Sequence, residues 1–336
     1  MRHWWWKFLA IALLTVASVA ALLAPLGPAL VHVSPSRIGP GDATITVTGY
    51  NTGWTAAEVP AARLANGEQF VCPQSVEVID ATHLRLKVAV PGGLRSMMTD
   101  LHVEGLAYPS AFHTTGIGDG AKEGTCEPAG PANSASAGFA FPNRSILYES
   151  IRNLHFHVPM WFTMIALMGL SVWKSIRHLG SGSLDRDREA ATAVHVGLLF
   201  CALGLLTGMV WARATWTAFW TNDVKLNGAA VTALIYLAYL VLRGSVADGH
   251  KRARLAAIYN IFAFMLLVLF LFVVPRLNQV DSLHPGSGGN SPFSDLDLDD
   301  RLRMVFYPAV AGWILLGLWI YDLRQRATRV QEKLDA

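Results

Sequence analysis

Six stretches of the chain consist of apolar residues with few or no charges, and they set the expected architecture. Each stretch approaches the roughly 20 residues that a helix needs to cross the hydrocarbon core of a bilayer. Because a segment in lipid must satisfy its own backbone hydrogen bonds, the stretches predict helices and not strands. The predicted spans lie near residues 4–24, 158–173, 191–212, 227–242, 255–275 and 304–321.

A different pattern occupies the interval from Val31 to about Thr115. There the segments ATITVTGYN, SVEVID and HLRLKVAV alternate apolar and polar residues, and Gly and Pro separate them. This alternation is typical of short antiparallel strands and predicts a small sandwich similar to immunoglobulin-like modules. The expected fold class is an all-α polytopic membrane protein of six transmembrane helices, with a small inserted β-sandwich-like domain outside the cytoplasm.

These patterns divide the chain into five segments. The first 30 residues have a basic start and an apolar centre, so a cleaved signal peptide is an alternative to a membrane helix. The length of the apolar stretch and the interfacial Trp4, Trp5 and Trp6 favour a retained helix. The expected segments are a first transmembrane helix at 1–30, a β-rich immunoglobulin-like domain at 31–115, a Gly- and Pro-rich linker at 116–143, a five-helix membrane domain at 144–325 and a cytoplasmic tail at 326–336.

Composition agrees with a membrane protein, since the 336 residues are 52% hydrophobic and the mean hydropathy is +0.35. Lys and Arg concentrate in one set of short segments, and the positive-inside rule assigns this richer set to the cytoplasm. Both termini are therefore expected in the cytoplasm, and the segment between the third and fourth spans faces outward. The net charge of +3 reflects this bias and does not indicate nucleic-acid binding. The richer set comprises Arg2, Lys7, Lys174, Arg177, Arg186, Arg188, Arg243, Lys251, Arg252, Arg254, Arg324, Arg326, Arg329 and Lys333, and the poorer set comprises Arg213, Lys225, Arg276, Arg301 and Arg303.

The chain has three cysteines, too few for a disulfide framework. Cys72 and Cys126 are expected in the same outer compartment, where a bridge between them could persist. Cys201 falls inside a predicted span and is expected to pack there. The sequence contains neither C-x-x-C nor C-x-x-C-H, which argues against a thiol oxidoreductase and against a c-type cytochrome.

The segment between the third and fourth spans is rich in tryptophan. It reads WARATWTAFWTND and contains Trp211, Trp216 and Trp220. Tryptophan gathers at the headgroup level of membrane proteins in general, so an aromatic belt is one interpretation. The other is a flat aromatic platform for a large planar apolar ligand, with Arg213 and Lys225 available for polar groups on the ligand's rim.

The order of residues in this segment carries a family resemblance. The run W-x4-W-x3-W-x2-D, followed by Lys225 and Leu226, resembles the tryptophan-rich WWD signature of haem-handling membrane proteins, and most of all the CcmC family of cytochrome c maturation. Many members have Trp immediately before the Asp, where this chain has Asn222. The corresponding WWD segment is 211–225. Asp223 belongs to the signature, and it is equally suited to cap the fourth helix.

Two histidines match further motifs of that family. Pro159 is expected in the first turn of the second span, which puts His157 at the outer face. The sequence His157-Val-Pro resembles the H-V-P motif that supplies one axial haem ligand, and His284 in S-L-H-P-G resembles the loop that carries the second. His155 lies outside the motif and is expected to be a neighbour. His195 is expected to make a helix-packing hydrogen bond.

The resemblance covers roughly residues 144–325 and implies a non-catalytic protein that binds haem b at the outer membrane face. It implies a location in the bacterial inner membrane, with the site facing the periplasm. It also implies presentation of haem to the haem chaperone CcmE, alongside an ABC-transporter-like complex of CcmA and CcmB. The implied haem-binding residues are His157, His284, Trp211, Trp216, Trp220 and Asp223, with His157 and His284 as axial ligands of the iron.

Two other functions stay open. A cytochrome c haem lyase of the same superfamily attaches haem to thiols, but such relatives generally have more membrane helices and additional histidine sites. A haem transporter would move haem through its own bundle, but the predicted spans are nearly free of ionisable residues and show no inverted repeat. The chain has no P-loop pattern, so any ATP hydrolysis belongs to a partner.

Overall fold

The computed structural model of the protein describes residues 4–66, 69–90, 96–104, 106–115, 139–144, 147–277, 282–284 and 298–335. The chain forms two compact units. One unit combines Met1–Ala24 with Glu149–Ala336 and is helical, and the other is Pro25–Tyr148 and is built from strands. The helical unit therefore contains an N-terminal helix that is separated in sequence from the rest of that unit.

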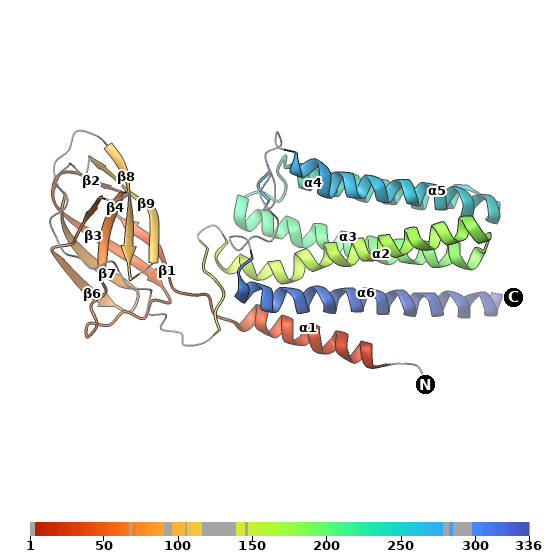
Figure 1. Ribbon diagram of the computed structural model, residues 1–336, viewed down its shortest axis with the longest axis horizontal. Coiled ribbons are helices and arrows are strands. Elements are labelled where there is room, and N and C mark those ends of the chain that lie inside the picture. Colours follow the sequence, from red (N-terminus) through yellow and green to blue (C-terminus); the bar gives the residue numbers. More distant parts are fainter. Residues whose placement is uncertain are drawn as a thin grey trace. The chain divides into compact units, whose positions relative to one another are not determined.

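Among the described residues, six helices are long and apolar enough to cross a membrane, which confirms the six predicted spans. Most extend beyond the apolar stretches, because their polar first and last turns are also helical. The helices are α1 (Trp5–Leu23), α2 (Leu154–Ser181), α3 (Leu184–Trp216), α4 (Val224–Ser245), α5 (Gly249–Val268) and α6 (Asp300–Asp335) (Figure 1). A 3-10 helix (Tyr148–Asn153) leads into α2, and α5 continues into a π-helical turn (Leu269–Val273) and a 3-10 turn (Val274–Arg276).

The helices of this unit share an apolar interior. Helix α2 packs against α3, α5 and α6, whereas α1 packs on α6 and lies beside it in Figure 1. Met164, Phe200 and Leu267 are among the buried side chains of the interior. Outward-facing positions such as Val241 and Phe262 are apolar and exposed, as helices surrounded by lipid require. The unit is a bundle with apolar surfaces on both its inside and its outside.

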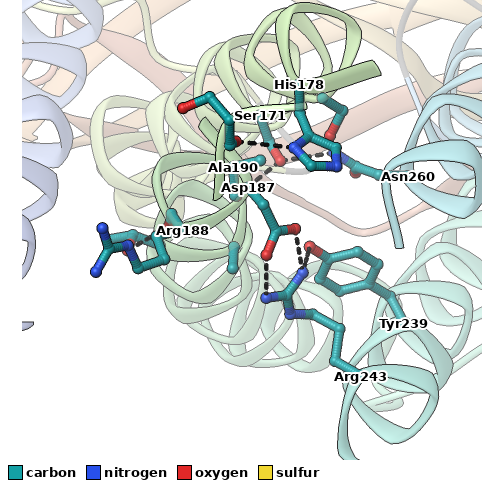
Figure 2. Close-up of polar contacts among 12 residues, drawn as sticks. Ser171, His178, Asp187, Arg188, Ala190, Tyr239, Arg243 and Asn260 are labelled. Carbon is teal, nitrogen blue, oxygen red and sulfur yellow. Dashed lines mark hydrogen bonds and ion pairs between the residues drawn. The ribbon is translucent and has the colours of Figure 1, made fainter. Parts of the chain in front are cut away.

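Buried polar groups connect the helices near the end of α2 and the start of α3 (Figure 2). Arg243 of α4 donates to both carboxylate oxygens of Asp187 of α3, at 2.6 and 2.8 Å. Asn260 of α5 donates to the hydroxyls of Ser171 and Ser175 of α2, at 2.7 and 3.0 Å. Because an unpaired polar group is costly in an apolar medium, these bonds fix which helices are neighbours.

Helix α1 is attached to the other helices at both of its ends. Near its start, Lys7 is buried and its Nζ lies 3.7 Å from Oδ2 of Asp322 on α6. At its end, Nη1 of Arg152 donates to the carbonyl oxygens of Ala21 and Ala24, at 2.8 and 2.6 Å. These carbonyls belong to the last turn, where a helix has no internal donors for them. The start of α1 therefore lies beside the later part of α6, and its end lies beside the start of α2.

The second unit is a sandwich of two sheets, with strand orders β1-β3-β7-β6 and β2-β9-β8-β4-β5. The described pairings are antiparallel except that β2 runs parallel to β9. Ile45 and Leu86 of the first sheet and Leu64 and Leu101 of the second belong to one buried core, as the alternating pattern predicts. The strands are β1 (Ala29–Ser34), β2 (Arg37–Ile38), β3 (Gly41–Tyr50), β4 (Ala62–Asn66), β5 (Gln69–Val71), β6 (Ser75–Asp80), β7 (His83–Val90), β8 (Ser96–Val103) and β9 (Leu106–Thr115).

The start of α2 differs from the expectation drawn from Pro159. Helix α2 begins at Leu154 and continues a 3-10 helix, so Pro159 lies inside the helix and not in its first turn. The preference of proline for a first turn is a tendency, and here the residues before it are already helical. His157 is in the first turn of α2, and its expected place at the outer membrane face stays a prediction.

Other predicted features are partly covered by the described residues. Cys201 is a buried free thiol in α3, whereas Cys72 is disulfide-bonded. Cys126 lies outside the described residues, as does most of the predicted linker, so the pairing of Cys72 with Cys126 stays a prediction. The predicted C-terminal tail continues α6 as a helix to Asp335.

Candidate functional site

Side chains from several segments of the helical unit meet where α2 begins and α3 ends. Helix α2 supplies His157, and the end of α3 supplies Trp211 and Trp216. Asp223 precedes α4, and His284 comes from the described part of the loop before α6. Ring contacts and hydrogen bonds join these side chains in two groups: His157 with Trp211, and Trp216 with His284 and Asp223. The two histidines are close enough to interact electrostatically, so the structure brings most of the predicted site residues into one region.

His157 and Trp161 lie against α3 where two glycines leave room for their rings. A methyl group at Gly208 would lie 2.7 Å from Cε1 of His157, and one at Gly204 would lie 3.0 Å from the ring of Trp161. Both distances are shorter than ordinary carbon–carbon contacts, so larger residues here would force the rings to move. The two glycines are four positions apart on one face of α3, which is the spacing that lets membrane helices approach closely.

Hydrogen bonds to α3 orient the imidazole of His157. Its Nδ1 lies 3.0 Å from the carbonyl oxygen of Gly204 and 3.2 Å from Oγ1 of Thr207. Because a carbonyl oxygen only accepts, Nδ1 carries the hydrogen and donates it to Gly204. In the neutral ring, Nε2 is then the nitrogen with the lone pair that a metal ion requires.

Each of the two motif histidines lies edge-to-face against a tryptophan of α3. The ring centroids of His157 and Trp211 are 5.7 Å apart at an interplanar angle of 79°. Those of Trp216 and His284 are 4.9 Å apart at 76°. This geometry is the favourable one for aromatic pairs and restricts how far either imidazole can turn. Two of the predicted platform residues therefore contact the histidines directly.

Trp220 lies beyond the end of α3 and is 39% exposed, so part of its indole remains accessible to a ligand. Its Nε1 donates to Oδ1 of Asn227 at 3.3 Å, and Nδ2 of Asn227 donates to Oδ1 of Asn222 at 2.8 Å. Asn222 stands where many WWD proteins have tryptophan. In this chain it is part of a short polar chain that orients Trp220.

Asp223 combines the two roles considered for it from the sequence. Its carboxylate accepts hydrogen bonds from two backbone N–H groups in the first turn of α4, which is N-cap geometry. It also accepts from Oγ of Ser282 at 2.7 Å, from the backbone N–H of Leu283 at 2.8 Å, and from Nδ1 of His284 at 3.0 Å. The same carboxylate thus caps a helix and holds the loop that carries His284.

The charge of Asp223 fixes which ring nitrogen of His284 carries a hydrogen. Burial raises the pKa of Asp223, but the hydrogen bonds from His284 and Ser282 outweigh it and hold this pKa well below its usual range. Asp223 is therefore ionised at neutral pH and can only accept hydrogen bonds. Nδ1 of His284 must carry a hydrogen, and Nε2 is its metal-competent nitrogen.

The structure separates the two motif histidines from two others. His157 and His284 are close enough to interact electrostatically. His155 is buried at 1% exposure and lies two residues before His157 in α2, with Phe156 between them. Nδ1 of His195 donates to the carbonyl of Ala191, four residues earlier in α3, at 2.7 Å. This bond lies within α3, so the expected bond of His195 to another helix stays a prediction.

This set of donors fits haem better than a clustered metal ion. Among the residues that the structure describes, no group of three or more His, Cys, Asp or Glu side chains could hold a metal ion. Haem is planar and largely apolar, and its iron takes axial ligands from the two sides of that plane. Two histidines with their Nδ1 atoms engaged, next to indole rings, match these requirements.

Sequence reasoning missed the residues that position the histidines. Gly204, Gly208 and Thr207 hold His157, and Ser282 joins the loop of His284 to Asp223. The four-residue spacing of the glycines is a readable signal for close helix packing. The spacing does not say which helix packs there, and Ser282 lies 59 positions from its partner.

Comparisons with known proteins match the membrane part of the chain. Residues 132–335 match the protein family described as Heme exporter protein C, a region that includes α2 to α6 and none of the strands. The chain is 31% identical over 188 residues to Heme exporter protein C of Bradyrhizobium diazoefficiens, which covers 54% of this chain and 68% of that relative. It is 24% identical over 208 residues to Heme exporter protein C of Paracoccus denitrificans, covering 59% and 81%. A shorter similarity, 34% over 101 residues, links 29% of the chain to 32% of Cytochrome c biogenesis protein CcsA of Prochlorococcus marinus.

Proposed function

Because the chain belongs to the Heme exporter protein C family, we propose that it binds haem b as cargo and presents it to the haem chaperone CcmE. The family membership and the six membrane-spanning helices make it a multi-pass membrane protein that handles haem for cytochrome c maturation. The proposed site is the region where α2 begins and α3 ends. There His157 and His284 are the axial ligands of the iron, and the protein carries out no catalysis.

The observation that supports this proposal most is that Nδ1 of each motif histidine donates a hydrogen bond. Nδ1 of His157 donates to Gly204, and Nδ1 of His284 donates to Asp223. Each ring also lies against a different tryptophan of α3. Both Nε2 atoms are therefore suited to bind iron, and both rings are held in orientation before any ligand arrives.

The residues around the histidines suit the remainder of the haem. Trp216 and Trp220 provide aromatic surface for its apolar plane, and Asp223 supports the arrangement by holding the loop of His284. Arg213 is exposed at the end of α3, where it can attract the carboxylates at the haem edge. Since Trp220 remains partly exposed, this is a site that can release its cargo as well as hold it.

We place this site at the periplasmic face of the bacterial inner membrane, with both termini in the cytoplasm. The concentration of Lys and Arg in one set of segments supports this orientation. The start of α1 contacts the later part of α6, so both chain ends lie away from the start of α2, which carries His157 (Figure 1). A complex of CcmA and CcmB would supply ATP hydrolysis, since this chain has no P-loop pattern.

The absorption spectrum of the protein purified in detergent tests the proposed ligands. Two imidazole ligands give a six-coordinate, low-spin haem. We expect His157→Ala or His284→Ala to shift the spectrum towards high spin or to lower the haem content, and the double variant to lose most of the haem. His195→Ala is the matched control, because it changes the same residue type in a helix of the same unit. A wild-type low-spin spectrum in both single variants would show that the ligand assignment is wrong.

Two further assays separate presentation from the alternatives. Sealed vesicles that contain only this protein should not accumulate haem, as they would if it were a transporter. Haem-loaded protein mixed with an apocytochrome alone should form no thioether bond, as it would if it were a haem lyase. Transfer of haem to purified CcmE is the positive outcome.

A further inference from the structure

We propose that the two histidines are unequal ligands, with His284 the stronger donor and His157 the weaker. This inference rests on the proposed function, in which both histidines bind one haem iron. It rests on the acceptors of the two Nδ1 atoms, because the acceptor of His284 is a charged carboxylate and that of His157 is a neutral carbonyl. The difference makes Asp223 a positioning residue that also sets the donor strength of one ligand.

On the side of His284, the acceptor is a buried carboxylate. The side chain of Asp223 is 1% exposed, and its Oδ1 lies 3.0 Å from Nδ1 of His284. The same oxygen also accepts from the backbone N–H groups of Lys225 and Leu226, at 2.9 and 3.3 Å, so the two sides differ in the charge of the acceptor. Hydrogen bonds from Ser282 and Leu283 keep the second oxygen in place, at 2.7 and 2.8 Å. The negative charge therefore cannot turn away from the imidazole. A hydrogen bond to a charged acceptor is roughly twice as strong as one between neutral groups.

On the side of His157, the acceptors are neutral. Nδ1 of His157 faces the carbonyl of Gly204 at 3.0 Å and the hydroxyl of Thr207 at 3.2 Å. The single hydroxyl hydrogen of Thr207 is within reach of the carbonyl of Leu203 at 2.8 Å and, at a longer 3.2 Å, of the carbonyl of Gly204. His157 is oriented as well as His284 is, but no charge polarises its ring.

Polarisation of the Nδ1–H bond changes the basicity of Nε2, the other nitrogen of the ring. A carboxylate that accepts from Nδ1 draws the hydrogen towards itself and makes Nε2 of the same ring more basic. Nε2 of His284 is therefore the better donor to iron, and it favours the ferric state more than Nε2 of His157 does. His284 would hold the haem, and His157 would be the ligand that is more easily replaced by an incoming ligand of an acceptor protein.

Cavity variants of the full-length protein test this asymmetry directly. His157→Gly and His284→Gly each remove one imidazole, and added imidazole or 1-methylimidazole can take its place. Imidazole can donate to the vacated acceptor, whereas 1-methylimidazole has no N–H and can turn its methyl group into the space left by the histidine Cβ. The ratio of the two affinities, measured by the return of the low-spin spectrum, reports the strength of the N–H contact in each cavity.

We expect this ratio to be about ten-fold larger in His284→Gly than in His157→Gly, which corresponds to about 1.4 kcal/mol. Comparing the two ratios removes any steric effect of the methyl group that the cavities share. Equal ratios would overturn the asymmetry and leave two-histidine ligation intact. Retention of the wild-type low-spin spectrum by both variants, without any added ligand, would overturn the proposed function itself.

An independent measurement uses variants that keep both histidines. Asp223→Asn should raise the midpoint potential of the bound haem, by about 59 mV if the donor strength changes ten-fold between iron states. Thr207→Val is the matched variant on the other side and should change the potential much less. Equal shifts in the two variants would overturn the proposal even if one of the cavity variants failed to fold.

Discussion

Arg243 and Asp187 form a buried ion pair between α4 and α3, and breaking it tests what holds the helices together (Figure 2). Arg243 donates to both carboxylate oxygens of Asp187, at 2.6 and 2.8 Å. The side chains of Arg243 and Asp187 are only 15% and 8% exposed. Arg243→Met keeps a long apolar side chain but leaves the carboxylate of Asp187 buried without its bidentate partner.

The expected cost follows from that geometry. Two hydrogen bonds to charged groups contribute about 1.5–3 kcal/mol each, and removing one partner of a buried pair costs about 3–5 kcal/mol. Arg243 keeps some contact with solvent, so the lower end of the range applies, about 3 kcal/mol. A neutral hydrogen bond between membrane helices averages only about 0.6 kcal/mol. Ser171→Ala, which removes a neutral bond from Asn260 and a neutral bond to the carbonyl of Ala190, is therefore a suitable reference.

Reversible unfolding of the purified protein in mixed detergent micelles, followed by circular dichroism, gives the free energy of unfolding. We expect Arg243→Met to lower this free energy by about 3 kcal/mol and Ser171→Ala by about 1 kcal/mol or less. The double variant Asp187→Leu/Arg243→Met should recover most of the loss, because no charge stays buried. The reasoning is refuted if Arg243→Met costs no more than Ser171→Ala, or if the double variant is as unstable as Arg243→Met alone.

Three further predictions concern other parts of the chain. Gly208→Ala places a methyl group 2.7 Å from the ring of His157, so the haem content in the absorption assay should fall. Gly244→Ala is the control and should leave the haem content unchanged, because nothing lies within 4 Å of its added methyl group. The pKa of Asp80 is lowered to about 2, mainly by the hydrogen bond from the backbone N–H of Thr82. Ionised Asp80 therefore stabilises the β domain fully above its unfolded pKa of about 3.9, and this stabilisation is lost as the pH falls towards 2. Thermal unfolding at pH 2 to 5 should show this loss, and Asp80→Asn should flatten the profile. Deleting the inserted β domain should leave haem content intact, since it contains none of the candidate ligands, and loss of haem from a folded truncated protein would contradict this.

The sequence alone determined the two kinds of structure in this chain. A membrane span must be apolar along its whole length, so the six helices are visible as local composition. Strands with one buried face alternate with a period of two, and segments such as HLRLKVAV show this pattern directly. The candidate ligands His157 and His284 were also found from local motifs. Each of these features lies within a short run of residues, where sequence is a sufficient guide.

Element boundaries were less well determined, because several local tendencies compete near helix ends. The expectation for Pro159 used the preference of proline for the first turn of a helix. Helix α2 instead begins five residues earlier, at Leu154, directly after a 3-10 helix. The hydrogen bond of His195 is a similar case. A side chain in a membrane helix can reach a carbonyl of its own helix or a neighbour's, and sequence does not say which.

Only the tertiary structure decided what surrounds the histidines. Asp223 could be read as a helix cap, but its contacts to Ser282 and His284 cross about 60 positions of sequence. The pairing of Arg243 with Asp187 likewise crosses 56 positions. Apolar periodicity tells each helix which residues face lipid, but many neighbours satisfy the same apolar face equally well. The choice among them depends on close approach at small residues and on the pairing of buried polar groups, and both become visible only when the helices are packed together.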